Sequence, residues 1–148
     1  EAHKEYAACC AGGVAGGETV VASRFAAWGP GRRKVRLVLP GEKRSRILRE
    51  APAETYTTRL SVVRRGPRAA LVRALIDRGF RHQVRAHLAH AGLPIVGDAL
   101  YGAALPPGAP ARMYLHAAAI VLPHPVTGAV LAVRSPLPAD FEALLSLA

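Results

Sequence analysis

Histidine and arginine side chains are concentrated between Arg78 and His90, in the stretch RGFRHQVRAHLAH. Clustered histidines can bind zinc, and arginines can hold a carboxylate or a phosphate through paired hydrogen bonds. On a helix, however, His82 projects about 140° away from His87, so the histidines do not converge on one metal ion. The neighbouring arginines also repel a cation. The stretch therefore favours a site for an anion or a nucleic acid over a zinc site.

Arg85 differs from the other arginines because Ala86 and Ala89 lie beside it on the predicted helix. Small neighbours let another group approach closely, so this guanidinium can bind a carboxylate or phosphate bidentately. The structural alternative is a surface arginine that lies over its own helix.

Other kinds of chemistry find little support in the sequence. No serine stands in a strand-turn-helix elbow, and the stretch AGGVAGGE lacks the spacing and the lysine of a phosphate-binding loop. The adjacent pair Cys9 and Cys10 has no electropositive helix start beside it to favour a thiolate. Neighbouring cysteines rarely bridge, so we expect free thiols and a cytoplasmic location.

The charge balance points to a polyanionic partner. The 148 residues include 20 Lys and Arg against 10 Asp and Glu, a net charge of +10. The basic residues recur in the segments GRRKVR, EKRSR, VVRRGPR and RGFRHQVR, so one basic face could contact many phosphates. A basic surface that serves only solubility is the alternative. No apolar stretch is long enough to span a bilayer, and we expect no membrane partner.

The hydrophobic pattern predicts an α+β domain with a mixed, mostly antiparallel sheet and packed helices. Helices are expected over 82–92, with Gly92 as the stop, and over 135–148, with Phe141, Leu144 and Leu145 on the apolar face. A charged loop is expected over 41–54, and residues 93–102 form a buried segment that leaves through a Gly-Asp turn. Strands are expected over 1–15, 34–40, 54–66 and 68–79, and a hairpin over 115–133 that turns near Thr127 and Gly128. The composition of 68–79 would also permit a short helix.

Several motifs resemble one enzyme family. The stretch RGFRHQVRAHLAHAGLPIVGDALYG closely resembles the third motif of the RluA-type RNA pseudouridine synthases, G-R-T-H-Q-I-R-V-H-L-A followed by G-x-P-I-x-G-D-x-x-Y-G. HKEYAA resembles the family segment K-x-Y-x-A, and AETYTTRLSVV resembles the strand A-x-T-x-Y-x-V-L. YLHAAAIVLPHPVTGAVLAVRSPLP resembles the tail L-H-A-x-x-L-x-F-x-H-P-x-T-G. These matches follow the family's order along nearly the whole chain.

The resemblance implies isomerisation of uridine to pseudouridine in structured RNA, ribosomal or transfer, without metal or cofactor. It implies that Tyr6 stacks on the target base and that Arg85 pairs with a catalytic aspartate. It places RNA contacts at the residues around the start of the helix. We expect the protein to be a monomer. These RNA-binding candidates are Arg81, His82, Gln83 and His87.

The sequence departs from the family pattern at two places. Residues 79–83 read GFRHQ where the family has G-R-T-H-Q, and the family's upstream motif R-L-D-x-x-T-S-G, which carries the nucleophilic aspartate, is absent. We therefore expect residues 1–148 to be the C-terminal part of a catalytic domain, inactive alone, with the aspartate partner of Arg85 outside them. A non-catalytic RNA-binding module is the alternative. A basic DNA-binding protein would need a reading helix, which is not recognisable here.

Overall fold

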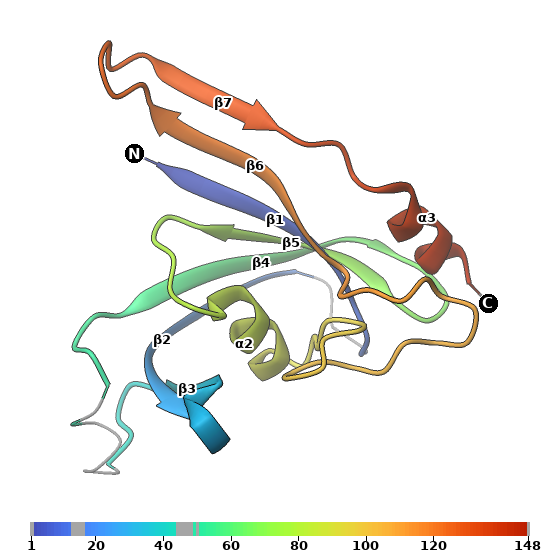
Figure 1. Ribbon diagram of the computed structural model, residues 1–148, viewed down its shortest axis with the longest axis horizontal. Helices are drawn as coiled ribbons and strands as arrows, with labels where there is room; N and C mark the ends of the chain where they lie inside the picture. Colours follow the sequence, from blue (N-terminus) through green and yellow to red (C-terminus); the bar gives the residue numbers. More distant parts are fainter. Residues whose placement is uncertain (1, 13–16, 44–48, 50, 148) are drawn as a thin grey trace.

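The computed structural model describes residues 2–12, 17–43, 49 and 51–147, and within them seven strands form one sheet (Figure 1). The order is β3-β2-β4-β5-β1-β6-β7, and each neighbouring pair of these strands is antiparallel. The fold is α+β, as the hydrophobic pattern predicted. The elements are β1 (His3–Cys10), β2 (Glu18–Trp28), the 3-10 turn η1 (Pro30–Arg32), β3 (Lys34–Val38), β4 (Tyr56–Arg65), β5 (Ala70–Ile76), α2 (Gln83–His90), β6 (Leu115–Pro123), β7 (Val130–Arg134) and α3 (Ala139–Ser146).

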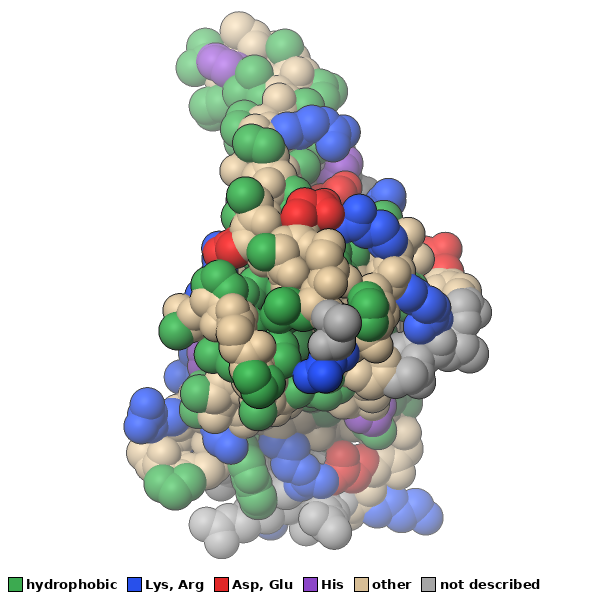
Figure 2. Space-filling model, turned by 90° about the vertical axis from the view of Figure 1, so that its right-hand side faces the viewer, with side chains coloured by type: hydrophobic (Ala, Val, Ile, Leu, Met, Phe, Trp, Pro, Cys, Tyr) green, Lys and Arg blue, Asp and Glu red, His purple; other side chains and the backbone are tan. Residues whose placement is uncertain are grey.

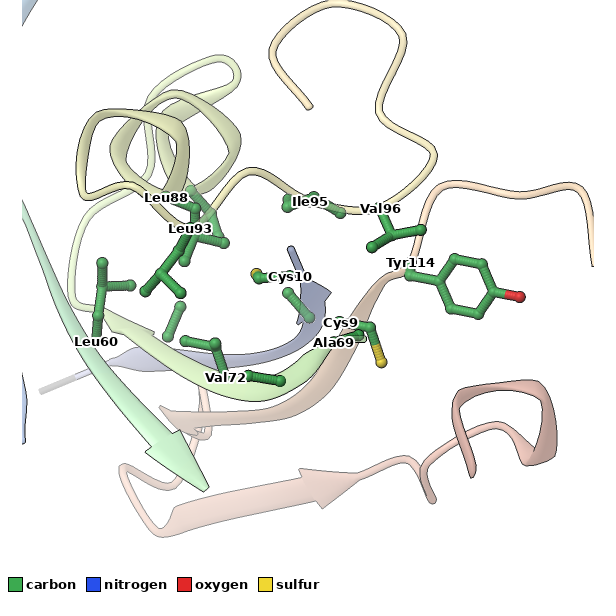
Figure 3. Packing of buried hydrophobic residues seen from close by; sticks show 14 of the residues in the cluster. Cys9, Cys10, Leu60, Ala69, Val72, Leu88, Leu93, Ile95, Val96 and Tyr114 are labelled. Carbon is green, nitrogen blue, oxygen red and sulfur yellow. The ribbon is translucent and has the colours of Figure 1, made fainter. Parts of the chain in front are cut away.

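The two helices lie against opposite faces of the sheet. Successive side chains on a strand point to opposite faces, and the last two residues of β1 show both layers. Cys10 forms a bridge with Ile95 on the side of α2, whereas the thiol of Cys9 points toward the side of Tyr114 and α3 (Figure 3). Both cysteines are free and fully buried, as expected for adjacent residues whose side chains diverge.

The core between α2 and the sheet holds the helix that carries Arg85. Leu88 of α2 and Leu93 just after it are directed at Leu60 and Val72 of the sheet (Figure 3), and all four are at most 2% exposed. Burial of each such side chain stabilises the fold by about 1.5–3 kcal/mol. Gly92, with φ of 75°, ends the helix as predicted, because a left-handed residue lets the chain turn back toward the sheet.

Helix α3 covers the other face through its predicted apolar residues. Phe141 and Leu144 are fully buried, and Leu145 is 4% exposed. The ring of Phe141 packs 5.3 Å from that of Tyr114, which precedes β6. None of the described helices is long enough and apolar enough to cross a membrane.

Strand β2 was not predicted from the sequence. Its inward face carries Val21, Ser23 and Phe25, and the buried serine interrupts the apolar alternation that would have revealed a strand. The first half of β2 pairs with β4 and the second half with β3, so the β2–β3 hairpin leads away from the centre of the sheet. The other predicted strands and both helices are present. Parts of the expected turn and loop, residues 13–16, 44–48 and 50, lie outside the described residues.

The β6–β7 hairpin projects from the body of the molecule (Figure 1). Its turn lies where the sequence predicted it: Gly128 has φ of 72°, and the amide of His124 donates to the carbonyl of Ala129 over 2.7 Å. The projecting end carries mainly hydrophobic side chains (Figure 2), including Val126 at 86% and Val130 at 76% exposure.

Candidate active site

A cleft of about 340 Å³ opens where β1 passes the beginning of α2. Tyr6 and Arg85, which are 79 positions apart in the sequence, both line it. The sheet brings them together because β1 lies beside the central strand β5, and α2 follows β5. The complete lining is Lys4, Tyr6, Ile76, Gly79, Phe80, His82, Gln83, Val84, Arg85 and Leu115.

The surroundings of Tyr6 leave its ring room for a ligand. Its partners in the neighbouring strands are Ala74 of β5 and Ala117 of β6, and both have minimal side chains. The register with β6 shifts between Glu5 and Tyr6, an irregularity of the kind that re-aims a side chain. Tyr6 is half-buried. A half-buried phenol ring at the wall of a cleft offers a face on which a planar base can stack.

Arg85 is held by a carboxylate within the chain. Its Nε donates to Oδ2 of Asp98 over 2.8 Å, and its Nη2 donates to Oδ1 over 2.6 Å. The side chain of Asp98 is completely buried, and that of Arg85 is 17% exposed. The sequence analysis expected the aspartate partner of Arg85 to lie outside residues 1–148. The structure shows a partner within the chain that was not predicted, because the turn after α2 folds back and supplies Asp98. The pairing of Arg85 with a catalytic aspartate stays a prediction.

The turn around Asp98 is built to receive the guanidinium. The backbone amides of Leu100 and Tyr101 donate to Oδ1 of Asp98 over 2.9 and 3.3 Å. Gly97 has φ of 77°, and a Cβ there would overlap the carbonyl oxygen of Arg112. The ring of Tyr101 lies 5.3 Å from the guanidinium carbon of Arg85. The motif G-D-x-x-Y-G therefore encodes a turn that contacts Arg85 from the edge and from one face.

The electrostatics of this pair keep both partners ionised. Burial alone would raise the pKa of Asp98, but hydrogen bonds from Arg85 and from the two amides outweigh burial and hold the pKa below its ordinary value. The hydrogen bonds that Arg85 donates to Asp98 raise the pKa of Arg85. A charged, doubly hydrogen-bonded pair of this kind has one defined geometry.

His87 and Gln83 were predicted to contact RNA, and the structure places both in the interior. His87 is fully buried: its Nε2 lies 2.9 Å from Oγ of Ser23, and its Nδ1 lies 2.7 Å from Oγ1 of Thr58. Gln83, 2% exposed, donates through Nε2 to the carbonyl of Thr57 and to Oγ1 of Thr58. Their hydrogen-bonding groups bind α2 to β2 and β4, so the direct RNA contact predicted for His87 is wrong for this structure. Gln83 is also among the residues that line the cleft.

His82 and Arg81 lie at the start of α2. His82 has φ of 58°, and its Nδ1 lies 3.2 Å from the hydroxyl of Tyr101. Burial, with Arg85 and Arg81 nearby, lowers the pKa of His82, so its ring is neutral at pH 7. Arg81 is exposed, and its Nη2 donates to the carbonyls of Arg32 and Lys34. His82 borders the cleft, and Arg81 ties the β2–β3 hairpin to its rim.

The departure from the family motif at Phe80 has a packing reason. The ring of Phe80 stacks on Phe25 of β2, with centroids 5.0 Å apart and planes inclined by 4°, and it contacts Tyr56 at 5.1 Å. An arginine at this position would have no place in such a cluster. The cleft therefore has an aromatic wall at Phe80, opposite in character to the cationic Lys4 and Arg85 that also line it.

Asp98, Tyr101 and Phe80 were not predicted as parts of the site. The first two stand in the quoted G-D-x-x-Y-G segment, which was interpreted only as a turn. Its signal was the pair of glycines: Gly97 and Gly102 each leave no room for a Cβ beside neighbouring backbone. Two such positions flanking a carboxylate indicate a tightly fixed acidic side chain.

Comparisons with known proteins agree with the geometry. No protein-family model matches the chain. Ribosomal large subunit pseudouridine synthase D of Pseudomonas aeruginosa is 41% identical over 87 residues, which cover 51% of this chain and 27% of that protein. The enzyme of the same name in Pasteurella multocida is 30% identical over 115 residues, covering 70% of this chain and 36% of that protein. The chain thus spans only about a third of the length of these relatives.

Solved structures show the same fold. Human RNA pseudouridylate synthase domain containing 1 superposes with a TM-score of 0.71 and 22% identity, covering 94% of this chain and 58% of that one. The corresponding domain-containing protein 4 gives 0.68 and 23%, over 97% and 61%. The fold is that of the pseudouridine synthases. Together with the sequence identities, it shows that the chain belongs to the RluA-type family of RNA pseudouridine synthases.

Proposed function

We propose that the protein isomerises uridine to pseudouridine in RNA, and that residues 1–148 supply the part of the active site with Tyr6 and Arg85. The observation that carries this proposal is the meeting of these two residues in one cleft of the family's fold. Because the relatives in bacteria are named for the ribosomal large subunit, we propose ribosomal RNA as the substrate class.

The reaction sets requirements that the cleft can meet in part. The glycosidic bond of uridine is cut, the uracil turns, and a carbon–carbon bond forms between C5 of the base and C1′ of the sugar. The nucleotide must leave the stack to reach such a site. Tyr6 offers the detached base a stacking surface, and Lys4 and Arg85 offer positive charge to phosphate or carboxylate oxygens.

A nucleophilic carboxylate is the part that these residues do not supply. No acidic side chain is among the described residues that line the cleft. The chain's three aspartates are each paired with an arginine: Asp77 with Arg59, Asp98 with Arg85, and Asp140 with Arg112. Our proposal takes the nucleophile from a segment beyond residues 1–148, so that these residues form the C-terminal part of the catalytic domain.

The β2–β3 hairpin is the surface that we propose for the RNA flanking the target. Trp28 is 50% exposed, and the guanidinium carbon of Arg36 lies 5.6 Å from the centre of its ring. The exposed Arg32 and Arg33 follow in the turn, and Arg81 joins the turn to the cleft rim. An exposed indole among cations suits single-stranded RNA, whose bases stack while its phosphates are neutralised. The free, buried thiols suit the reducing cytoplasm that we propose as its location.

A tritium-release assay tests the proposal. RNA labelled at C5 of uridine loses tritium to water when pseudouridine forms. We expect release by the protein at the full length that its gene encodes, and a fall of about 100-fold or more when Arg85→Lys removes the planar fork of donors. A protein that binds the RNA but releases no tritium would instead be a non-catalytic RNA-binding module on this scaffold.

A further inference from the structure

We infer that Asp98 is the positioning residue for Arg85: it binds one edge of the guanidinium and so turns the other edge toward the cleft. This inference rests on the proposed function. Asp98 is not among the residues that line the cleft, so its action on a bound nucleotide passes through Arg85.

The pattern of hydrogen bonds defines which edge is held. Asp98 receives Nε and Nη2 of Arg85, and in the described part of the chain Nη1 donates no hydrogen bond. A guanidinium carries its five donors in one plane, so fixing Nε and Nη2 also fixes the direction of Nη1. The two N–H groups of Nη1 and the second N–H group of Nη2 are thereby the donors left for oxygens in the cleft.

The hold on Asp98 is itself rigid. The amides of Leu100 and Tyr101 fix its carboxylate from the backbone. The hydroxyl of Tyr101 in turn accepts the amide of Val35 in β3 over 2.6 Å, which anchors the turn to the sheet. A completely buried carboxylate that is held by two backbone amides cannot move with the side chain of Arg85. Arg85 is therefore placed by the turn as well as by its own helix.

Asp98→Asn separates positioning from folding. The carbonyl oxygen of asparagine can still accept the amides of Leu100 and Tyr101, so the turn is retained. The amide nitrogen, however, presents a donor where Arg85 needs an acceptor, and the negative charge is lost. Asp140→Asn is the matched control, because Asp140 also pairs with an arginine, Nη1 of Arg112 at 2.9 Å, but on α3 and away from the cleft.

The first readout is the exchange of the Nε proton of Arg85 with water, measured by NMR in the full-length protein and assigned by its loss in Arg85→Lys. We expect about tenfold faster exchange in Asp98→Asn and no change in Asp140→Asn. The second readout is tritium release. We expect kcat to fall about 100-fold while KM stays nearly constant, because a wrongly oriented Arg85 guanidinium slows the chemical step without weakening substrate binding. A loss of folding alone would speed the exchange of buried backbone amides throughout the domain together with that of Arg85, whereas loss of positioning speeds the exchange of Arg85 selectively.

Three results would overturn the inference. One is a folded Asp98→Asn variant with unchanged exchange at Arg85, and another is unchanged kcat in that variant. The third needs no variant: exchange at Arg85 in the natural protein as fast as at Arg64, whose ion pair with Glu142 is half exposed. If the natural protein releases no tritium, the proposed function fails, while the exchange measurements still decide whether Asp98 holds Arg85.

Discussion

Acid should destabilise the protein through His87, the histidine that joins α2 to the sheet. Its ring is fully buried between Ser23 and Thr58, and it stacks 5.0 Å from the ring of Phe25. Burial, and to a smaller extent His90, lowers the pKa of His87 from 6.5 to about 4. The unfolded chain keeps the ordinary value. Between pH 6.5 and 4, His87 is therefore protonated in the unfolded state but stays mostly neutral in the folded state, so acid favours unfolding.

The size of the effect follows from the two pKa values. Each unit of difference corresponds to about 1.4 kcal/mol, so His87 makes no difference above pH 7 and removes about 2 kcal/mol of stability by pH 5. The loss reaches a limit of about 3 kcal/mol as the pH falls to the folded pKa near 4. For a single domain this is a large part of the total stability.

Urea unfolding followed by circular dichroism at several pH values between 7 and 5 measures this loss. In His87→Gln the site cannot titrate, so the stability difference between the natural protein and this variant should shift by about 2 kcal/mol in the variant's favour across the range. His90→Gln is the control: His90 is exposed, and this variant should keep most of the pH dependence. A constant difference between the natural protein and His87→Gln would refute the burial of a neutral His87.

Four further outcomes are expected. Trp28→Ala should weaken RNA binding in a filter assay by about 1–3 kcal/mol per stacked base, and unchanged affinity would exclude stacking there. Gly97→Ala should lower the free energy of unfolding by about 1–3 kcal/mol from backbone strain, with a further loss from overlap at Arg112; a neutral effect would mean that the turn is not as described. Phe141→Ala should cost about 3–5 kcal/mol in denaturant with RNA affinity retained, whereas a loss below about 1 kcal/mol would place the ring outside the core. Residues 1–148 alone should release no tritium, because none of the described residues that line the cleft carries a carboxylate; turnover would show that the nucleophile has been misplaced.

The sequence predicted the elements whose patterns are regular. Strand β4 alternates and α2 repeats every three to four residues, so periodicity alone located them. The stretch that forms β5 was predicted as a strand, but its composition would also have permitted a short helix. Strand β2 escaped because Ser23 faces the interior, where its hydroxyl meets His87. From the sequence alone, a buried polar residue whose hydrogen-bond partner lies across the core cannot be distinguished from an exposed polar residue. Ser23 and His87 are 64 positions apart in the sequence, and only the folded structure shows that they are partners.

The site shows the same division. Family motifs brought out Tyr6 and Arg85, and the structure places both at the cleft. Motifs also suggested RNA contact for His87, but a motif position does not say whether a side chain faces out of a helix or into the core. Asp98 was present in the motif, but its pairing with Arg85 depends on the path of the turn after α2. The burial of His87 and the pairing of Asp98 with Arg85 both depend on the tertiary fold, which local sequence patterns do not specify.

The most direct test of the account is the structure of the full-length protein bound to RNA with 5-fluorouridine at the target position. Fluorine at C5 blocks the proton loss that completes the isomerisation, so the nucleotide should stay in the site. We expect the flipped base to stack on Tyr6, with an oxygen of the nucleotide or of a catalytic carboxylate accepting from Nη1 of Arg85. A nucleotide bound away from this cleft, with Tyr6 and Arg85 uninvolved, would contradict the account.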